Sequence, residues 1–408
     1  MTNLPQGWEV KKLGEIGEIV TGSTPSKSNL DFYGKDYPFF KPSDFEQGYF
    51  LENAGDNLSK LGFDKARQLP PKTILVVCIG SLGKVALTRV IGSCNQQINA
   101  IIPHKNIIAE YIYYYCISSK FQSILFSKAP QTTLAILNKT EFSKLEIIYP
   151  KDIKEQERIV GILDESFAKI DESIKILEQD LLNLDELMQS ALQKAFNPLK
   201  DNAKENYKLP QGWEWKNLGE IANTSSGGTP SRNKKEYWEN GNIKWLKSGE
   251  LNDGYIDFIE ENITEEAIKN SSAKIFQKGT LLIAMYGATA GKLGILNLDS
   301  TTNQAICAFL HKDKNIKFLE KFLFYFLFFL RDKIIKDSFG GAQPNINQTY
   351  IKNLQIPLPP LKEQEQIASH LDELSSHVKN LKQNYQAQIK NLQELKNSLL
   401  DKAFKGNL

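Results

Sequence analysis

Hydrophobic positions recur with a heptad period along the segment Ile153–Phe196. Steps of four and three residues place a single apolar stripe on one side of a helix. The stripe is formed by Leu163, Phe167, Ile170, Ile174, Leu177, Leu181, Leu184, Met188, Ala191 and Ala195. No Pro or Gly follows Gly161 in this segment, so we expect one continuous helix of about 66 Å. A helix of that length is too long for one face of a compact domain and needs a partner helix.

A second heptad stripe near the C-terminus offers that partner within the same chain. It consists of Leu371, Leu374, Val378, Leu381, Tyr385, Gln388, Leu392, Leu395 and Leu399. Coiled coils commonly tether or dimerise proteins, so the stripes alone do not define a function. Further apolar positions on the two helices are more than one antiparallel partner can cover. We therefore expect another protein to dock on Ile159, Ile162, Ile176, Phe196, Ile367, Ile389 and Phe404.

The chain contains two copies of one repeated sequence. LPQGWEVKKLGEI at Leu4 recurs as LPQGWEWKNLGEI at Leu209, and GSTPS at Gly22 recurs as GGTPS at Gly227. A Gly-Lys loop ends at Lys84 in the first copy and at Lys292 in the second, and the motifs CNQQINAI and TNQAICAF follow them. KEQERI and KEQEQI open the two helices, and KAF closes both. So many matches in one order indicate a duplication.

The repeat divides the chain into five segments. We expect globular segments at 1–150 and 209–360, long helices at 151–196 and 361–408, and a linker at 197–208, which contains Pro198 and no apolar period. The linker spans at most about 42 Å, less than the expected helix length. The two helices are therefore expected to run antiparallel, with the globular segments at opposite ends, related by an approximate two-fold axis, and the C-terminus beside the N-terminus.

Each globular segment mixes strand and helix patterns. Ile74–Ile79 and Leu281–Met285 are short apolar runs that end near Gly, which is typical of buried strands. Tyr111–Leu125 and Phe318–Ile335 have helical length. The expected fold class is therefore α/β (α+β), with two repeated mixed α/β domains joined by two long antiparallel coiled-coil helices.

Charge and cysteine content narrow the class of protein. The 50 Lys and Arg residues nearly balance the 48 Asp and Glu residues, but 151–196 holds six basic and eleven acidic residues. An anionic partner would therefore meet the mildly basic globular segments. The four Cys form no CxxC pair, which favours reduced core thiols in an intracellular, cytoplasmic protein. There is no signal peptide pattern, and the apolar run Phe322–Leu330 is too short to cross a membrane.

No catalytic or metal-binding motif is recognisable. The loop Gly287–Gly291 has three intervening residues where a phosphate-binding loop has four, and Leu293 occupies the position of the Mg²⁺-binding hydroxyl. HExxH, GxSxG and a strand-linked GxGxxG are also missing. We expect neither an enzyme nor a bound cofactor in this chain.

Polar loop residues are the remaining candidates for function. Asn and Gln suit adenine edges, and Lys suits phosphates; a turn-capping role is the commoner one for any single Asn or Gln beside Gly. Lysines shared by both copies are expected to contact phosphates or support the fold. Bases are expected to be read by residues in the stretches where the two copies differ. The DNA-binding candidates are Lys41, Ser43, Lys84, Asn95, Gln96, Gln131, Lys247, Ser248, Lys292, Asn303, Gln304, Gln343 and Asn345.

These motifs together resemble the specificity subunits of type I restriction-modification systems over essentially the whole chain. The resemblance rests on LPxGWE, GxTPS, the Gly-Lys loop, NQxI, the run PLPPLKEQEQI at Pro357 and the KAF endings, nearly all present twice. The first copy departs at Tyr149–Ile153, where YPKDI replaces the Pro-rich run.

The resemblance implies a subunit that reads double-stranded DNA for other proteins. It implies two target recognition domains, each reading half of a bipartite site, and a spacer of antiparallel helices. Two modification subunits would supply S-adenosylmethionine-dependent adenine methylation, and restriction subunits would supply ATP- and Mg²⁺-dependent translocation and cleavage. Two alternatives stay open at this point: a type IIB-like system, and a coiled-coil tether that does not bind DNA.

Overall fold

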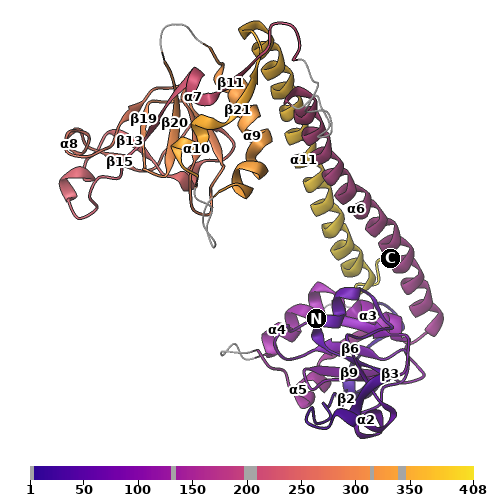
Figure 1. Ribbon diagram of the computed structural model, residues 1–408. Coiled ribbons are helices and arrows are strands. Elements are labelled where there is room, and N and C mark those ends of the chain that lie inside the picture. The colour runs from indigo at the N-terminus through magenta and orange to yellow at the C-terminus, as the bar shows by residue number, and fades with distance from the viewer. Residues whose placement is uncertain (1–3, 130–134, 197–208, 313–316, 339–345) are drawn as a thin grey trace. The chain divides into compact units, whose positions relative to one another are not determined.

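The computed structural model describes residues 4–129, 135–196, 209–312, 317–338 and 346–408. They form two compact units (Figure 1). Unit 1 comprises Met1–Glu178 and Tyr385–Leu408, and unit 2 comprises Gln179–Asn384. Each unit contains a mixed α/β globular part and about one half of each long helix. The linker expected at 197–208 lies outside the described residues.

A five-stranded sheet in the order β2-β9-β6-β7-β4 organises the globular part of unit 1. A second sheet has the order β5-β3-β8, and β1 pairs with β10. Both the strand β6 and the mixed class were expected from the sequence. The strands are β1 (Trp8–Lys12), β2 (Gly17–Thr21), β3 (Tyr33–Phe40), β4 (Phe50–Leu51), β5 (Asp56–Leu58), β6 (Ile74–Val77), β7 (Val85–Thr88), β8 (Ser93–Cys94), β9 (Ile98–Pro103) and β10 (Glu146–Pro150).

The strand β6 is buried on both of its faces. Ile74 and Val76 belong to a core that the helices of unit 1 cover. Leu75 and Val77 point the other way, into a second core that also contains Phe40. Burial on both faces explains why β6 has an unbroken apolar sequence instead of an alternating one.

The segment expected to be one helix at Tyr111–Leu125 forms two helices. Ser118 is buried in extended backbone between them, and its hydroxyl accepts a hydrogen bond from the Phe121 N–H, so it caps the second helix. The short helices of unit 1 are α1 (Leu13–Ile16), η1 (Leu30–Phe32), η2 (Pro42–Gln47), α2 (Lys60–Lys65), α3 (Ala109–Ile117), α4 (Ser119–Lys128) and α5 (Lys139–Ser143).

Unit 2 repeats this topology. Its five-stranded sheet has the order β12-β20-β17-β18-β14, a second sheet has the order β15-β13-β19-β16, and β11 pairs with β21. The strands are β11 (Glu214–Asn217), β12 (Ala222–Ser226), β13 (Ile243–Leu246), β14 (Gly254–Ile256), β15 (Asn262–Ile263), β16 (Ile275–Phe276), β17 (Leu281–Ala284), β18 (Leu293–Leu296), β19 (Ser300–Thr302), β20 (Ile306–His311) and β21 (Gln355–Leu358).

The second copy keeps as one helix what the first copy splits. This helix, α9, contributes the aromatic run around Phe322 and Phe326 to the core of unit 2, as expected for a buried helix. Among the described residues, no helix has the length and apolar character needed to cross a membrane. The helices of unit 2 are α7 (Leu218–Ile221), η4 (Lys235–Tyr237), η5 (Ser248–Glu250), α8 (Glu265–Lys269), α9 (Glu320–Lys336) and α10 (Gln348–Asn353).

The long helices α6 (Ile153–Phe196) and α11 (Leu361–Ala403) lie side by side and antiparallel in each unit (Figure 1). In unit 1, the Arg158 guanidinium donates to the Leu408 carbonyl at 3.0 Å, and Asp171 pairs with Lys396. In unit 2, Asp185 pairs with Lys382. Residue numbers therefore rise along one helix as they fall along its neighbour, as expected.

The apolar stripe expected on α6 faces α11, but the stripe expected on α11 is wrong at Leu381, Gln388 and Leu395, which are exposed. Leu381 and Leu395 are 40% and 46% exposed. Lys382 and Lys396 turn inward in their place, since their long aliphatic stems cover apolar surface while the ammonium groups reach carboxylates. The inward face of α11 passes through Leu371, Ser375, Val378, Lys382, Tyr385, Ile389, Leu392, Lys396 and Leu399.

The two ends of the chain meet in unit 1, as expected. The position of a Cβ atom on Gly406 would fall against the Pro5 ring. A separate feature of the core is its cysteines, since all four are free and buried. Burial raises the pKa of the Cys78 thiol to about 12, so thiolate chemistry at this side chain is suppressed near neutral pH.

Candidate nucleic-acid interface

Strand register brings several polar loops to one edge of the five-stranded sheet in each unit. In unit 1, Thr21 at the end of β2 pairs with Asn99, and Val77 at the end of β6 pairs with Ile98. The ends of β2 and β6 therefore lie beside the start of β9. We call this the loop edge. It comprises 22–29, 41–48, 78–84 and 94–97 in unit 1, and 227–234, 247–253, 285–292 and 303–305 in unit 2.

Lys41 and Lys247 hold equivalent turns at the loop edge. The Lys41 N–H donates to the Asp44 carboxylate at 2.7 Å, and its ammonium pairs with Asp56. The Lys247 N–H donates to Glu250 at 2.8 Å, and its ammonium lies 2.7 Å from Glu261. The Glu261 carboxylate raises the pKa of Lys247. Both charges are already paired, which favours a role in the fold over phosphate binding.

Lys84 and Lys292 follow glycines with left-handed backbone, Gly83 at φ +89° and Gly291 at φ +79°. The Lys84 ammonium lies 3.4 Å from the Glu46 carboxylate, and both side chains are exposed. Lys292 is exposed and makes no ion pair with any described residue. Each loop continues into a strand, whereas a phosphate-binding loop continues into a helix. The geometry therefore offers two exposed cations and no nucleotide site.

A helix beneath each Gly-Lys loop holds its glycine carbonyl. In unit 1, the Gln122 amide donates to the Gly83 carbonyl at 2.9 Å. In unit 2, Arg331 Nε donates to the Gly291 carbonyl at 2.9 Å, and its guanidinium pairs with Asp253. Neither residue was a candidate from the sequence. The break at Ser118 shifts the two helices out of register, so the sequence repeat does not align them.

Asn95 and Asn303 form turns. The Asn95 side chain accepts from the Gln97 N–H at 3.0 Å, and the Asn303 side chain accepts from the Ala305 N–H at 3.2 Å. Their own backbone N–H groups donate to Phe40 and Leu246, respectively, at the ends of neighbouring strands. Asn95 and Asn303 therefore have the geometry of turn-capping residues.

Gln96 and Gln304 are exposed beside those turns. The Thr24 hydroxyl donates to the Gln96 side chain at 2.5 Å, and the Thr229 hydroxyl donates to the Gln304 side chain. These bonds connect each glutamine to the GxTPS loop of its own unit. Of the candidates shared by both copies, these two combine exposure with a fixed amide group.

The positions of the remaining candidates do not indicate a role in binding. Ser43 and Ser248 lie in the short helices η2 and η5, which follow Lys41 and Lys247. Ala135 also lies at the loop edge of unit 1, since the Gly80 N–H donates to the Ala135 carbonyl at 3.3 Å. Gln131, Gln343 and Asn345 lie outside the described residues.

Three apolar positions expected to dock a partner are covered by the chain itself. Ile159 and Phe404 lie in the main core of unit 1, and Phe196 lies in that of unit 2, each at most 5% exposed. The reasoning from uncovered apolar positions is wrong for these three, because each globular part packs on the helix ends. Ile162, Ile367 and Ile389 are half-buried. The exposed large apolar side chains in the middle parts of α6 and α11, which we call the helix apolar set, are Ile176, Leu182, Leu187, Leu381 and Leu395.

The chain is similar to proteins with one common description. The family model for the type I restriction modification DNA specificity domain matches residues 5–181 and 210–391. The HindI specificity subunit of Haemophilus influenzae is 38% identical over 186 residues, 44% of this chain and 40% of that protein. The MjaIX specificity subunit of Methanocaldococcus jannaschii is 26% identical over 419 aligned positions, 99% of this chain and 94% of that protein. A solved structure from a study of assembly and conformational transition in the type I R-M system has the same fold, with a TM-score of 0.82 at 22% identity over both whole chains.

Proposed function

Since the chain belongs to the type I restriction modification DNA specificity family, we propose that it reads the DNA target of such a system for catalytic partner subunits. The supporting observation is that one loop edge occurs twice, once in each family match. Each copy combines a lysine whose side chain reaches solvent and an exposed glutamine at the edge of a sheet. Two such edges suit a target made of two half-sites.

Different side chains of the loop edge take different parts in DNA binding. Lys84 and Lys292 follow left-handed glycines and contact phosphates, which strengthens binding without selecting a sequence. Gln96 and Gln304 present amide groups that suit an adenine edge. Lys41, Lys247, Asn95 and Asn303 shape the loops that carry them. Further selectivity comes from loop residues that differ between the two units.

The segments of the chain carry these roles. Residues 1–150 and 209–360 are target recognition domains, and 151–196 and 361–408 are spacer helices. Modification and restriction subunits dock on the chain, two modification subunits being implied by the repeat, and the helix apolar set supplies exposed contacts for them. S-adenosylmethionine, ATP and Mg²⁺ belong to those subunits, and this chain supplies recognition without a reaction of its own.

Genome-wide mapping of methylated adenine tests the proposal. The full chain is expressed with the modification subunits encoded beside it, in a host without other adenine methyltransferases. We expect one bipartite motif whose methylation disappears when this chain is omitted. Methylation that persists without the chain, or none when all subunits are present and soluble, contradicts the proposal. The neighbouring genes also separate a type I system from a type IIB-like one.

A further inference from the structure

Each unit has a tyrosine–aspartate hydrogen bond where a long helix meets its globular part. The Tyr114 hydroxyl donates to Asp164 at 2.6 Å in unit 1, and the Tyr325 hydroxyl donates to Asp372 at 2.8 Å in unit 2. The two aspartates occupy the same place after the repeated KEQE motifs of α6 and α11. They are therefore equivalent, and each unit serves as a reference for the other.

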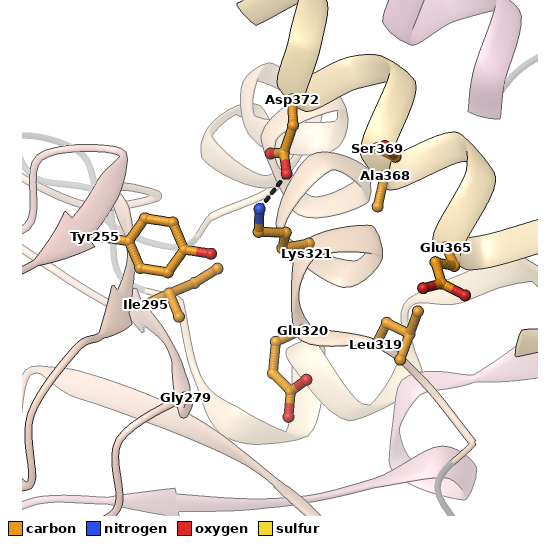
Figure 2. Close-up of a pocket in the computed structure, with 10 residues that line it drawn as sticks. All are labelled: Tyr255, Gly279, Ile295, Leu319, Glu320, Lys321, Glu365, Ala368, Ser369 and Asp372. Carbon is orange, nitrogen blue, oxygen red and sulfur yellow. Dashed lines mark hydrogen bonds and ion pairs between the residues drawn. The ribbon is translucent and has the colours of Figure 1, made fainter. Parts of the chain in front are cut away.

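In unit 2, the chain itself places a cation at this aspartate. Lys321 pairs with Asp372, and its ammonium lies 5.5 Å from the centre of the Tyr255 ring. Figure 2 shows Lys321 between the Asp372 carboxylate and the Tyr255 hydroxyl. Although burial opposes the charged form, the Asp372 carboxylate and the Tyr255 hydroxyl raise the pKa of Lys321. The cavity around this cation has a volume of about 420 Å³.

In unit 1, the corresponding position is an acid. Glu110 lies two residues after Ile108, as Lys321 lies two residues after Leu319. The N–H groups of Ile108 and Leu319 bond to equivalent glutamines, which fixes this alignment. The Glu110 carboxylate turns to Lys72, whose ammonium is 3.0 Å away. The unit 1 cavity is larger, about 970 Å³.

Two polar groups in this cavity lack the cation that their counterparts bind. The exposed Asp164 carboxylate makes no ion pair with any described residue. The Tyr49 hydroxyl, equivalent to that of Tyr255, is buried beside the Tyr114 hydroxyl, which already donates to Asp164. A buried hydroxyl whose neighbouring hydroxyl is already engaged is stabilised by a further partner, so a cation from outside would be favoured there.

The walls of the unit 1 cavity suit an organic cation. Tyr49 stacks on Tyr113 at 4.1 Å, and Phe167 meets Tyr114 edge-on at 5.4 Å. Aromatic faces attract ammonium and guanidinium groups. At the rim, Lys396 already lies 4.8 Å from the Phe167 ring centre, and it is paired with Asp171. Lys396 thus already shows the attraction between an ammonium group and an aromatic ring in this cavity. Asp164, in contrast, has no cation paired with it among the described residues.

We propose that the unit 1 cavity binds a lysine or arginine side chain of a docked protein subunit, at the position that Lys321 fills in unit 2. This inference rests on the proposed function, which supplies such a subunit. The volume accommodates a long side chain, and aromatic walls with one open carboxylate favour an organic cation over a metal ion. Because unit 2 fills its own site, the two units hold their partners differently despite one fold.

Two substitutions test the site in the full chain with co-expressed modification subunit as the probe. Glu110→Lys gives unit 1 the lysine of unit 2 and blocks the site. Asp164→Asn removes the charge but keeps an oxygen that accepts from Tyr114. We expect each to weaken binding of one modification subunit about tenfold, measured by native mass spectrometry over a titration. Wild-type affinity for both copies in both variants overturns the inference.

Matched variants separate this effect from folding. Lys72→Ala removes the ion pair that Glu110→Lys also breaks, and Asp372→Asn makes the same change in the filled site of unit 2. We expect both controls to bind the modification subunits as the wild type does. An equal loss in the Asp372→Asn variant also overturns the inference, because it would show a general effect of the helix junction. Thermal unfolding of each variant identifies those that do not fold.

A free polyamine shares the chemistry of the proposed side chain. Calorimetric titration of the full chain with spermidine distinguishes the two sources. Spermidine binding that Asp164→Asn abolishes, together with unchanged subunit affinity, assigns the cavity to a polyamine and overturns the inference. If wild-type chain binds no modification subunit, the proposed function fails. If the wild type binds two copies and the variants match it, only the cavity assignment fails.

Discussion

Gln156 and Gln364 make the same three hydrogen bonds in their two units. Gln156 accepts from the Ile108 N–H at 2.9 Å and donates to the carbonyls of Asn106 and Pro150. Gln364 does the same with the Leu319 N–H and with the carbonyls of Lys317 and Pro359. Both side chains are at most 1% exposed. One amide thus joins the first turn of each long helix to two segments of its globular part.

Replacement of either glutamine by alanine is expected to destabilise its unit. Gln156→Ala leaves a buried N–H and two carbonyls without their partner, at a cost of about 1–3 kcal/mol. Gln364→Ala is expected to cost a similar amount. Urea unfolding measures the change, with exposed Gln189→Ala on α6 as the matched control. A loss no greater than that of the control would show that backbone rearrangement or water replaces the amide.

Lys292→Ala is expected to weaken DNA binding for all sequences alike. An exposed lysine at a phosphate contributes about one unit to the slope of log binding constant against log salt. Lys84→Ala is expected to change the slope less, because Glu46 already lies 3.4 Å from that ammonium. Fluorescence anisotropy of the subunit complex at several salt concentrations measures both slopes. A change in the preferred sequence would contradict the assignment to phosphates.

Gln304→Ala is expected to relax sequence preference in one half-site. Loss of a base contact removes about 1–3 kcal/mol of discrimination at one position. The neighbouring Asn303→Ala is expected to lower stability instead, because the Asn303 side chain accepts from the Ala305 N–H. Methylome mapping reads the preference, and thermal unfolding reads the stability. The prediction fails if the alanine variant of Gln304 keeps the wild-type motif while that of Asn303 relaxes it.

Arg331→Met is expected to impair the loop of unit 2 that we propose binds DNA, although Arg331 itself does not contact DNA in that proposal. Methionine keeps much of the apolar stem but loses the bonds to the Gly291 carbonyl and to Asp253. The loop that carries Lys292 then loses its support, so affinity for DNA falls by an amount similar to that of Lys292→Ala. The double variant should lose little more than either single variant. Fully additive losses in anisotropy would show that the two residues act separately.

Sequence periodicity predicted α6 well because its apolar residues coincide with its buried face. On α11 the same rule selected Leu381 and Leu395, since they fit a heptad as well as the residues beside them. The structure turns Lys382 and Lys396 inward instead and half-buries them. A one-residue shift of this kind depends on which neighbouring carboxylates can meet an ammonium. Apolar periodicity alone does not contain that information.

The loop edge could be predicted in kind but not in detail. The resemblance of the chain's motifs correctly indicated the family, and the repeat singled out loops that strand register brings together. It did not separate Asn95, which shapes a turn, from exposed Gln96 beside it, because both are amides next to each other in the chain. Gln122 and Arg331 were missed because a helix break places them out of sequence register. Three-dimensional packing decides such roles.

The inward lysines also set a condition on gene exchange. Asp171 and Asp185 come from the first half of the chain, whereas their partners Lys396 and Lys382 come from the second half. A recombination event that replaces only the first half brings new residues to both lysines. Donors with acids at these two positions preserve both pairs. Donors with lysine at positions 171 and 185 would place two positive charges together at each of these contacts. The two helices of such hybrids would then assemble poorly, even if each half recognises DNA.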